Sequence, residues 1–156
     1  MPHVTTTRQV DVPLSRLWAS WDDFANIDAF NPNLNRSFLI NRSSDTGLGA
    51  ERQCDFSDGK NHIKERVIGY TPERELIIDI YDGSVPLKTA GATFTFRALG
   101  PSKSEVTMRF EFTPKFGPLG WLMVPLIKAQ FRPALARLLD GNKAYLEDGV
   151  VIARAA

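Results

Sequence analysis

The sequence has little of what a metal, disulfide or nucleotide site requires. Its 156 residues include one cysteine, Cys54, and two histidines, His3 and His62. One cysteine excludes a disulfide within the chain, and so few sulfur and imidazole ligands do not favour a zinc site. The sequence also has no GxGxxG, GxxxxGK or GxSxG pattern, so nucleotide binding and serine-hydrolase chemistry have no motif to support them. We therefore expect no metal ion and no cofactor.

Neither an excess of one charge nor a long apolar run is present. The chain has 19 basic and 18 acidic residues, for a net charge of +1. Because nucleic-acid-binding domains usually carry a strong basic excess, we expect no nucleic-acid partner. No apolar run reaches the roughly 18 residues of a membrane span, so stable membrane insertion is not expected. The beginning, MPHVTTTRQVD, lacks an apolar signal segment, which favours a cytoplasmic location.

The length and the hydrophobic pattern of the chain fit one domain that begins with a strand and two short helices. The length fits a single domain over residues 1–156. Residues 3–11 are rich in Thr and Val and predict a strand. Pro13 then opens a short helix whose apolar side chains, Trp18 among them, share one face, and Phe24 to Phe30 form a second short helix or turn.

The middle of the chain predicts a sheet. Segments of alternating apolar and polar residues, separated by Gly, Pro and Asp turns, predict strands over 36–42, 49–57, 60–70, 74–82, 90–99 and 104–113. The connections are too short to contain crossover helices, so consecutive strands should pair antiparallel. With the first strand this makes a seven-stranded sheet that has one apolar, aromatic face.

After Lys115 the apolar period becomes that of a helix. Apolar residues from Val124 to Tyr145 form a stripe, while Pro125 and Pro133 predict a kink or a break, with 117–124 partly separate. A long amphipathic helix is the element suited to cover the sheet's apolar face. The prediction is an α+β fold in which a seven-stranded antiparallel sheet grips a long C-terminal helix, with two short helices after the first strand.

Several motifs in this order resemble a known family. They are Val12-Pro13 through Trp18 with Asp23-Phe24, then Gly49 to Arg52, then Lys64 to Val67 with Tyr70, and finally Phe112-Thr113-Pro114 followed by Gly117 to Gly120. The set resembles the START-like, or helix-grip (SRPBCC), superfamily, and within it the bacterial polyketide cyclase/dehydrase-like proteins. The resemblance implies the helix-grip fold. It implies a function less clearly, because the superfamily includes lipid carriers, hormone receptors, enzymes and chaperone cofactors.

One predicted hairpin brings two charges together. Asp58-Gly59 is a strong turn signal, and a turn there pairs Arg52 with Glu65 and Cys54 with Ile63. Alternation then points Arg52 and Glu65 to the same interior face, where a charge pair must be hydrogen-bonded. The resemblance agrees, since relatives have an arginine and a glutamate inside their cavity. Three roles stay open: a salt bridge without chemistry, a polar anchor for a ligand, and acid/base catalysis by Glu65.

The aromatic residues predict an apolar cavity between the sheet and the long helix. Simple core packing is the alternative for each of them. The predicted ligand-binding side chains are Trp18, Phe30, Cys54, Phe56, Ile63, Val67, Phe94, Phe96, Met108, Phe110, Phe112, Trp121, Phe131 and Leu135.

The segment 119–127 is apolar nearly all round. It predicts a buried helix start that closes the cavity, with Gly117 and Gly120 as hinges if it moves as a lid. The alternative is an exposed patch for a partner or a membrane surface.

The sequence predicts a protein that binds a small hydrophobic or amphipathic molecule, of lipid, polyketide or aromatic type, as its partner. The first alternative is a cyclase or dehydratase, with Glu65 transferring a proton and Arg52 stabilising an oxyanion. The second is a docking module that acts through residues 119–127. A homodimer is left open.

Overall fold

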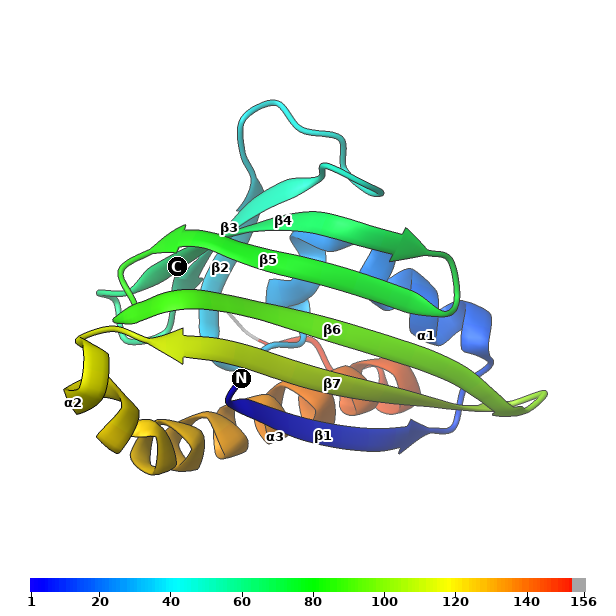
Figure 1. Cartoon of the computed structure of the whole chain (residues 1–156). Helices are drawn as coiled ribbons and strands as arrows, with labels where there is room; N and C mark the ends of the chain where they lie inside the picture. The colour runs from blue at the N-terminus through cyan, green and yellow to red at the C-terminus, as the bar shows by residue number, and fades with distance from the viewer. Residues whose placement is uncertain (153–156) are drawn as a thin grey trace.

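Seven strands form one antiparallel sheet in the order β1-β7-β6-β5-β4-β3-β2 (Figure 1). The computed structural model describes residues 1–152 of the chain. The strands are β1 (His3–Val10), β2 (Leu34–Leu39), β3 (Glu51–Phe56), β4 (His62–Thr71), β5 (Glu75–Gly83), β6 (Leu87–Gly100) and β7 (Lys103–Pro114). All seven predicted strands are present, and the antiparallel pairing of consecutive strands from β2 to β7 is confirmed.

The strand limits differ from the prediction where the backbone turns. β2 ends at Leu39 instead of residue 42. Asn41 and Arg42 have φ angles of 57° and 53°, in the left-handed region that does not continue a strand. Alternation on β6 and β7 places Phe94, Phe96 and Phe112 on the buried face, as the sequence predicts.

Four helical segments accompany the sheet. α1 (Leu14–Asp22) and η1 (Phe24–Ala29) follow β1, while α2 (Gly117–Leu122) and α3 (Val124–Asp148) follow β7. Pro118 and Pro125 lie in the first turns of α2 and α3, where a missing N–H does no harm, and the two helices are separated at Met123. The predicted separation of this segment from the long helix is confirmed, although Pro133 lies inside α3 without ending it. The helix-grip α+β fold is therefore confirmed.

The two halves of α3 are anchored unequally. Residues 135–148, here called its second half, contain all of its buried residues, which are Leu135, Leu138, Leu139, Asn142 and Leu146, and residues 124–134 are called its first half. The Asn142 side chain accepts a hydrogen bond from Trp21 Nε1 at 3.2 Å and donates one to Ser20 Oγ at 3.0 Å. Gly141 packs so closely on the Phe30 carbonyl that a Cβ there would overlap it. The first half of α3 has no fully buried side chain and lies over the candidate site.

Candidate functional site

The hairpin of β3 and β4 places the predicted charge pair as expected. Asp58 accepts hydrogen bonds from the backbone N–H groups of Lys60 and Asn61 at 2.8 and 2.9 Å, and Gly59 has a φ of 71°. This turn sets the register in which Arg52 faces Glu65 and Cys54 faces Ile63. Both of these predicted pairings are confirmed.

Arg52 and Glu65 form a buried ion pair. The Arg52 Nε donates to Glu65 Oε2 at 2.5 Å, and Nη1 donates to the Phe24 carbonyl at 2.7 Å. The guanidinium also lies 3.9 Å from the centre of the Phe24 ring, within the range of a cation–π contact. The side chains are only 3% and 9% exposed. Arg52 therefore joins β3, β4 and η1 as well as facing the interior.

The electrostatics of this cluster keep the arginine charged and the thiol neutral. Burial has the largest effect on the pKa of Arg52 and lowers it. Attraction to Glu65 is the first of several effects that raise this pKa, and together they outweigh burial, so the pKa is raised. Burial, followed by the nearby Glu65 charge, raises the pKa of Cys54 well above its usual value. The protonated thiol donates to Glu65 Oε2 at 3.4 Å. This arrangement does not activate Cys54 as a nucleophile.

Glu65 retains one oxygen for a ligand. Both hydrogen bonds that the described residues donate to its carboxylate end on Oε2. Oε1 is left able to accept a further hydrogen bond, and Glu65 belongs to the wall of a pocket. A ligand hydroxyl or N–H could therefore be held there without breaking the ion pair.

A pocket of about 500 Å³, here called the main pocket, lies between the sheet and residues 127–138 of α3. Ten of the predicted site residues line it: Arg52, Cys54, Phe56, Ile63, Glu65, Phe94, Met108, Phe110, Phe131 and Leu135. The Phe131 ring of α3 lies 4.8 Å from the Phe110 ring of β7, which brings helix and sheet together at this wall.

The prediction missed two groups of lining residues. One group is apolar and includes Ile80, Ala92, Ile127 and Leu138, which strand alternation and helical spacing could have added. The other is polar: Asn31, Asn33, Ser57, Asp58 and Asn61 come from loops and turns, and Gln130 and Arg137 come from α3. Sequence periodicity gives no signal for loop residues, so the five loop residues could not be found in this way.

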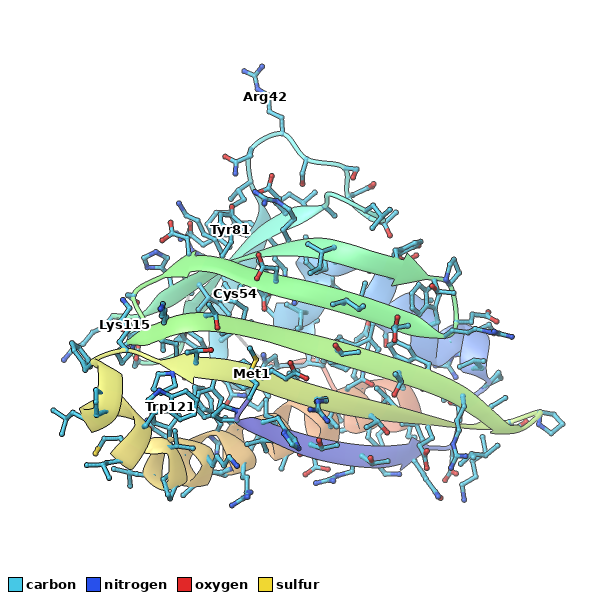
Figure 2. The ribbon with its side chains drawn as sticks, viewed as in Figure 1. Met1, Arg42, Cys54, Tyr81, Lys115 and Trp121 are labelled. Atoms are coloured by element: carbon cyan, nitrogen blue, oxygen red, sulfur yellow. The ribbon has the colours of Figure 1, made fainter. Side chains whose placement is uncertain are left out.

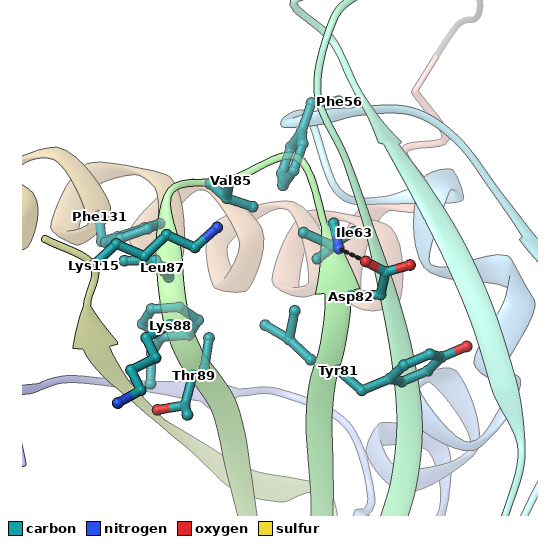
Figure 3. A pocket seen from close by; sticks show the side chains of 14 residues that line it. Phe56, Ile63, Tyr81, Asp82, Val85, Leu87, Lys88, Thr89, Lys115 and Phe131 are labelled. Atoms are coloured by element: carbon teal, nitrogen blue, oxygen red, sulfur yellow. Dashed lines mark hydrogen bonds between the residues drawn. The ribbon is translucent and has the colours of Figure 1, made fainter.

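A smaller hollow of about 230 Å³ adjoins the main pocket at one end of the sheet (Figure 3). The pairing of β5 with β6 stops at Ile80 and Ala90, and the hollow lies where the two strands then separate. It shares Phe56, Ile63, Phe110 and Phe131, among others, with the main pocket. Lys88 and Lys115 also belong to its lining (Figure 3).

Six predicted ligand-binding residues do not line either hollow. They are Trp18, Phe30, Val67, Phe96, Phe112 and Trp121. The first five are buried in the core. For example, the Trp18 ring packs against the rings of Phe96 and Tyr70 at 5.2 and 5.4 Å. Phe112 packs instead against Phe131 of α3, with ring centroids 5.9 Å apart. Trp121 is instead 51% exposed on α2.

The expectation that residues 119–127 form a buried helix start is wrong. The exposed apolar side chains of this segment and its N-terminal neighbour are called the α2–α3 apolar surface, which consists of Phe116, Leu119, Trp121, Leu122, Met123 and Leu126. Gly120 is also not a free hinge, because a Cβ at this position would overlap the Lys115 carbonyl. This glycine is required for close packing.

Two features are absent from residues 1–152. No group of three or more His, Cys, Asp or Glu side chains in this range is arranged to hold a metal ion. No helix in the same range is long and apolar enough to cross a membrane.

A sheet gripping a C-terminal helix, with a pocket between them, is the arrangement of a helix-grip ligand-binding fold. The family described as "Polyketide cyclase / dehydrase and lipid transport" matches residues 1–147, and the chain belongs to this family. The comparison with curated proteins found no match.

Solved structures share the fold at low sequence identity. The protein XoxI from Bacillus cereus is 18% identical with a TM-score of 0.78, covering 95% of this chain and 97% of that one. A START superfamily protein from Mycobacterium smegmatis is 16% identical with a TM-score of 0.77, covering 93% and 97%. The ZhuI aromatase/cyclase from a Streptomyces species is 12% identical with a TM-score of 0.71, covering 96% and 98%. At these identities the likeness establishes the fold alone.

Proposed function

We propose that the protein binds a small hydrophobic or amphipathic molecule, of lipid, polyketide or aromatic type, in the main pocket. The observation that carries this proposal is an apolar pocket with a buried Arg52–Glu65 pair in its wall. Apolar walls with a few placed polar groups are typical of small-molecule sites, because burial supplies affinity and the polar groups fix orientation.

The size of the main pocket suits such a ligand. Its volume of about 500 Å³ lies within the range of roughly 300–1,000 Å³ that small-molecule sites occupy. It is also about three times the roughly 150 Å³ of an engineered cavity that holds one benzene ring. A fused-ring aromatic or a medium-length acyl chain is therefore a fitting occupant.

The distribution of polar groups favours an amphipathic ligand over a purely apolar one. Glu65 Oε1 offers an acceptor in the pocket wall, while the loop residues Asn33 and Asn61 and the α3 residue Gln130 provide polar groups elsewhere in the lining. A ligand with an apolar body and one or two hydroxyl or carbonyl groups would match both.

The cyclase or dehydratase alternative depends on the same two side chains. Arg52 Nε donates to Glu65 Oε2 at 2.5 Å, so this oxygen is already engaged and could not donate a proton without disrupting the ion pair. Glu65 could still accept a proton through Oε1. Binding is therefore the function the geometry supports best. Turnover of a polyketide-like carbonyl substrate that is lost in Glu65→Gln would favour the enzyme.

A matched pair of substitutions on α3 tests the binding proposal. Ala134 lines the main pocket, whereas Ala129 is exposed on the same helix. We expect Ala134→Trp to fill the pocket and Ala129→Trp to leave it open. Native mass spectrometry of gently purified protein should show a non-covalent added mass in the wild type and in Ala129→Trp that is absent from Ala134→Trp.

A direct titration covers the case of a ligand lost during purification. Binding of 2-naphthol and of decanoic acid to the wild type should weaken by about tenfold or more in Ala134→Trp, because the added ring takes up the apolar volume. The proposal would be contradicted if the two tryptophan variants bound the probes with equal affinity. It would also be contradicted if the wild type showed no added mass and no saturable binding of either probe.

A further inference from the structure

The α2–α3 apolar surface is the largest feature that the proposed function leaves unexplained. Its six side chains are 44 to 77% exposed, and they follow one another along α2 and the start of α3. Single exposed apolar side chains are ordinary, but a contiguous group of this kind marks a place where something else binds. α2 lies at one end of the sheet, and Figure 2 shows Trp121 and Lys115 there.

The charged residues nearest to this surface in the sequence are all basic. Residues 113–139 contain Lys115, Lys128, Arg132 and Arg137 but no Asp or Glu, although the whole chain is nearly balanced. Among the described residues, neither Lys115, Lys128 nor Arg132 forms an ion pair, whereas arginines on the sheet such as Arg97 and Arg109 do. An apolar surface whose neighbours in the sequence are unpaired cations is complementary to an anionic partner.

We propose that the α2–α3 apolar surface docks on an anionic lipid bilayer. The apolar side chains enter the interface between headgroups and acyl chains, and Lys115, Lys128 and Arg132 lie against the anionic headgroups. Trp121 suits this location, because tryptophan favours the boundary between water and lipid.

The geometry favours a bilayer over a protein surface. At 3.6 residues per turn, Leu119 and Leu122 share one face of α2, whereas Trp121 lies about 100° around the helix from Leu122, and all three are exposed. A flat protein surface covers one face of a helix, whereas a fluid interface can take up side chains from more than one exposed face of α2. A second copy of this chain is a poor fit as well, because it would bring two sets of like charges together.

This inference goes beyond the proposed function and does not depend on it. The two features are nevertheless neighbours, since Ile127 and Phe131 line the main pocket immediately after Leu126. Docking would therefore place the α3 wall of the pocket next to the bilayer.

The three tryptophans provide a direct measurement. Trp18 and Trp21 are 7% and 2% exposed, so a change in tryptophan emission reports mainly on Trp121. With phosphatidylcholine vesicles that contain phosphatidylserine, we expect a blue shift, protection from an aqueous quencher and co-sedimentation. Pure phosphatidylcholine should give much less binding, and added salt should weaken the anionic binding because it screens the lysines.

Matched variants separate docking from folding. Leu122→Ser with Leu126→Ser keeps Trp121 as the probe and should lower vesicle partitioning by about tenfold or more, because two exposed apolar side chains are lost. Ile68→Ser is the control, since Ile68 is 56% exposed on β4, away from this surface, and should bind as the wild type does. Lys128→Glu with Arg132→Glu should abolish the preference for anionic vesicles.

Several results would overturn the proposal. These are no blue shift with either vesicle, unchanged partitioning of the leucine variant, or equal binding to neutral and anionic vesicles. The proposal would also be overturned if the wild type did not bind vesicles but formed a dimer, or a stoichiometric complex with another protein, that the leucine variant disrupts. Failure of docking is distinguishable from failure of the pocket proposal, because Ala134→Trp should still bind vesicles and the leucine variant should still bind 2-naphthol.

Discussion

Replacing Arg52 with methionine tests whether the interior ion pair stabilises the fold. The substitution removes the 2.5 Å bond to Glu65, the 2.7 Å bond to the Phe24 carbonyl and the contact with the Phe24 ring. It leaves the Glu65 carboxylate buried without its counter-charge. Breaking a buried pair on one side costs about 3–5 kcal/mol of the free energy of unfolding.

The double variant Arg52→Met with Glu65→Leu should recover most of that loss. An apolar pair of similar volume removes the unpaired charge, and the Phe24 carbonyl remains as a buried acceptor that costs about 1–3 kcal/mol. We therefore expect the two substitutions to be non-additive, with a coupling free energy of at least about 2 kcal/mol.

Urea denaturation followed by circular dichroism measures both variants. With an m value of about 2 kcal/mol/M, a loss of about 4 kcal/mol lowers the midpoint by about 2 M. Arg97→Met is the control, because Arg97 forms a cross-strand pair with Glu105 at 2.7 Å on the exposed face and its loss should cost at most about 1 kcal/mol. The reasoning is refuted if Arg52→Met costs no more than Arg97→Met, or if the double variant loses the sum of its two single variants.

Two further predictions concern Gly141 and Cys54. Gly141→Ala should destabilise the protein by about 1–3 kcal/mol, although alanine is the better helix former, because its Cβ would overlap the Phe30 carbonyl; a gain in stability by urea denaturation would contradict this. The pKa of the Cys54 thiol is raised in the folded state, so above about pH 8.5 the unfolded chain loses this proton before the folded protein does. The free energy of unfolding should therefore fall with rising pH, by at most about 1.4 kcal/mol per pH unit. Cys54→Val should lack this part of the slope, and identical pH profiles would show that the thiol is not the cause.

The sequence was sufficient to predict the fold and the register of the central hairpin. Asp58-Gly59 specified the turn, and strand alternation then placed Arg52 opposite Glu65 on the interior face. These conclusions depend on local chemistry with a fixed period, which is why they could be drawn without a structure.

The extent of the pocket could not be obtained in the same way. Alternation shows that Phe96 and Phe94 point to the same face, but only the packing shows that Trp18 covers Phe96 while Phe94 lines the pocket. Trp121 illustrates a second limit. An apolar run in a short helix is typical of burial, and nothing local shows whether another element covers it.

The unequal anchoring of α3 has a consequence for how such a protein can diverge. Its second half contributes the buried side chains and the tight approach at Gly141, so changes there are expected to be costly. Its first half contributes Ile127, Phe131 and Ala134 to the pocket and has no fully buried residue. Substitutions in that half can alter the shape of the binding space while the fold stays intact, so one scaffold can acquire new specificities without first having to become more stable.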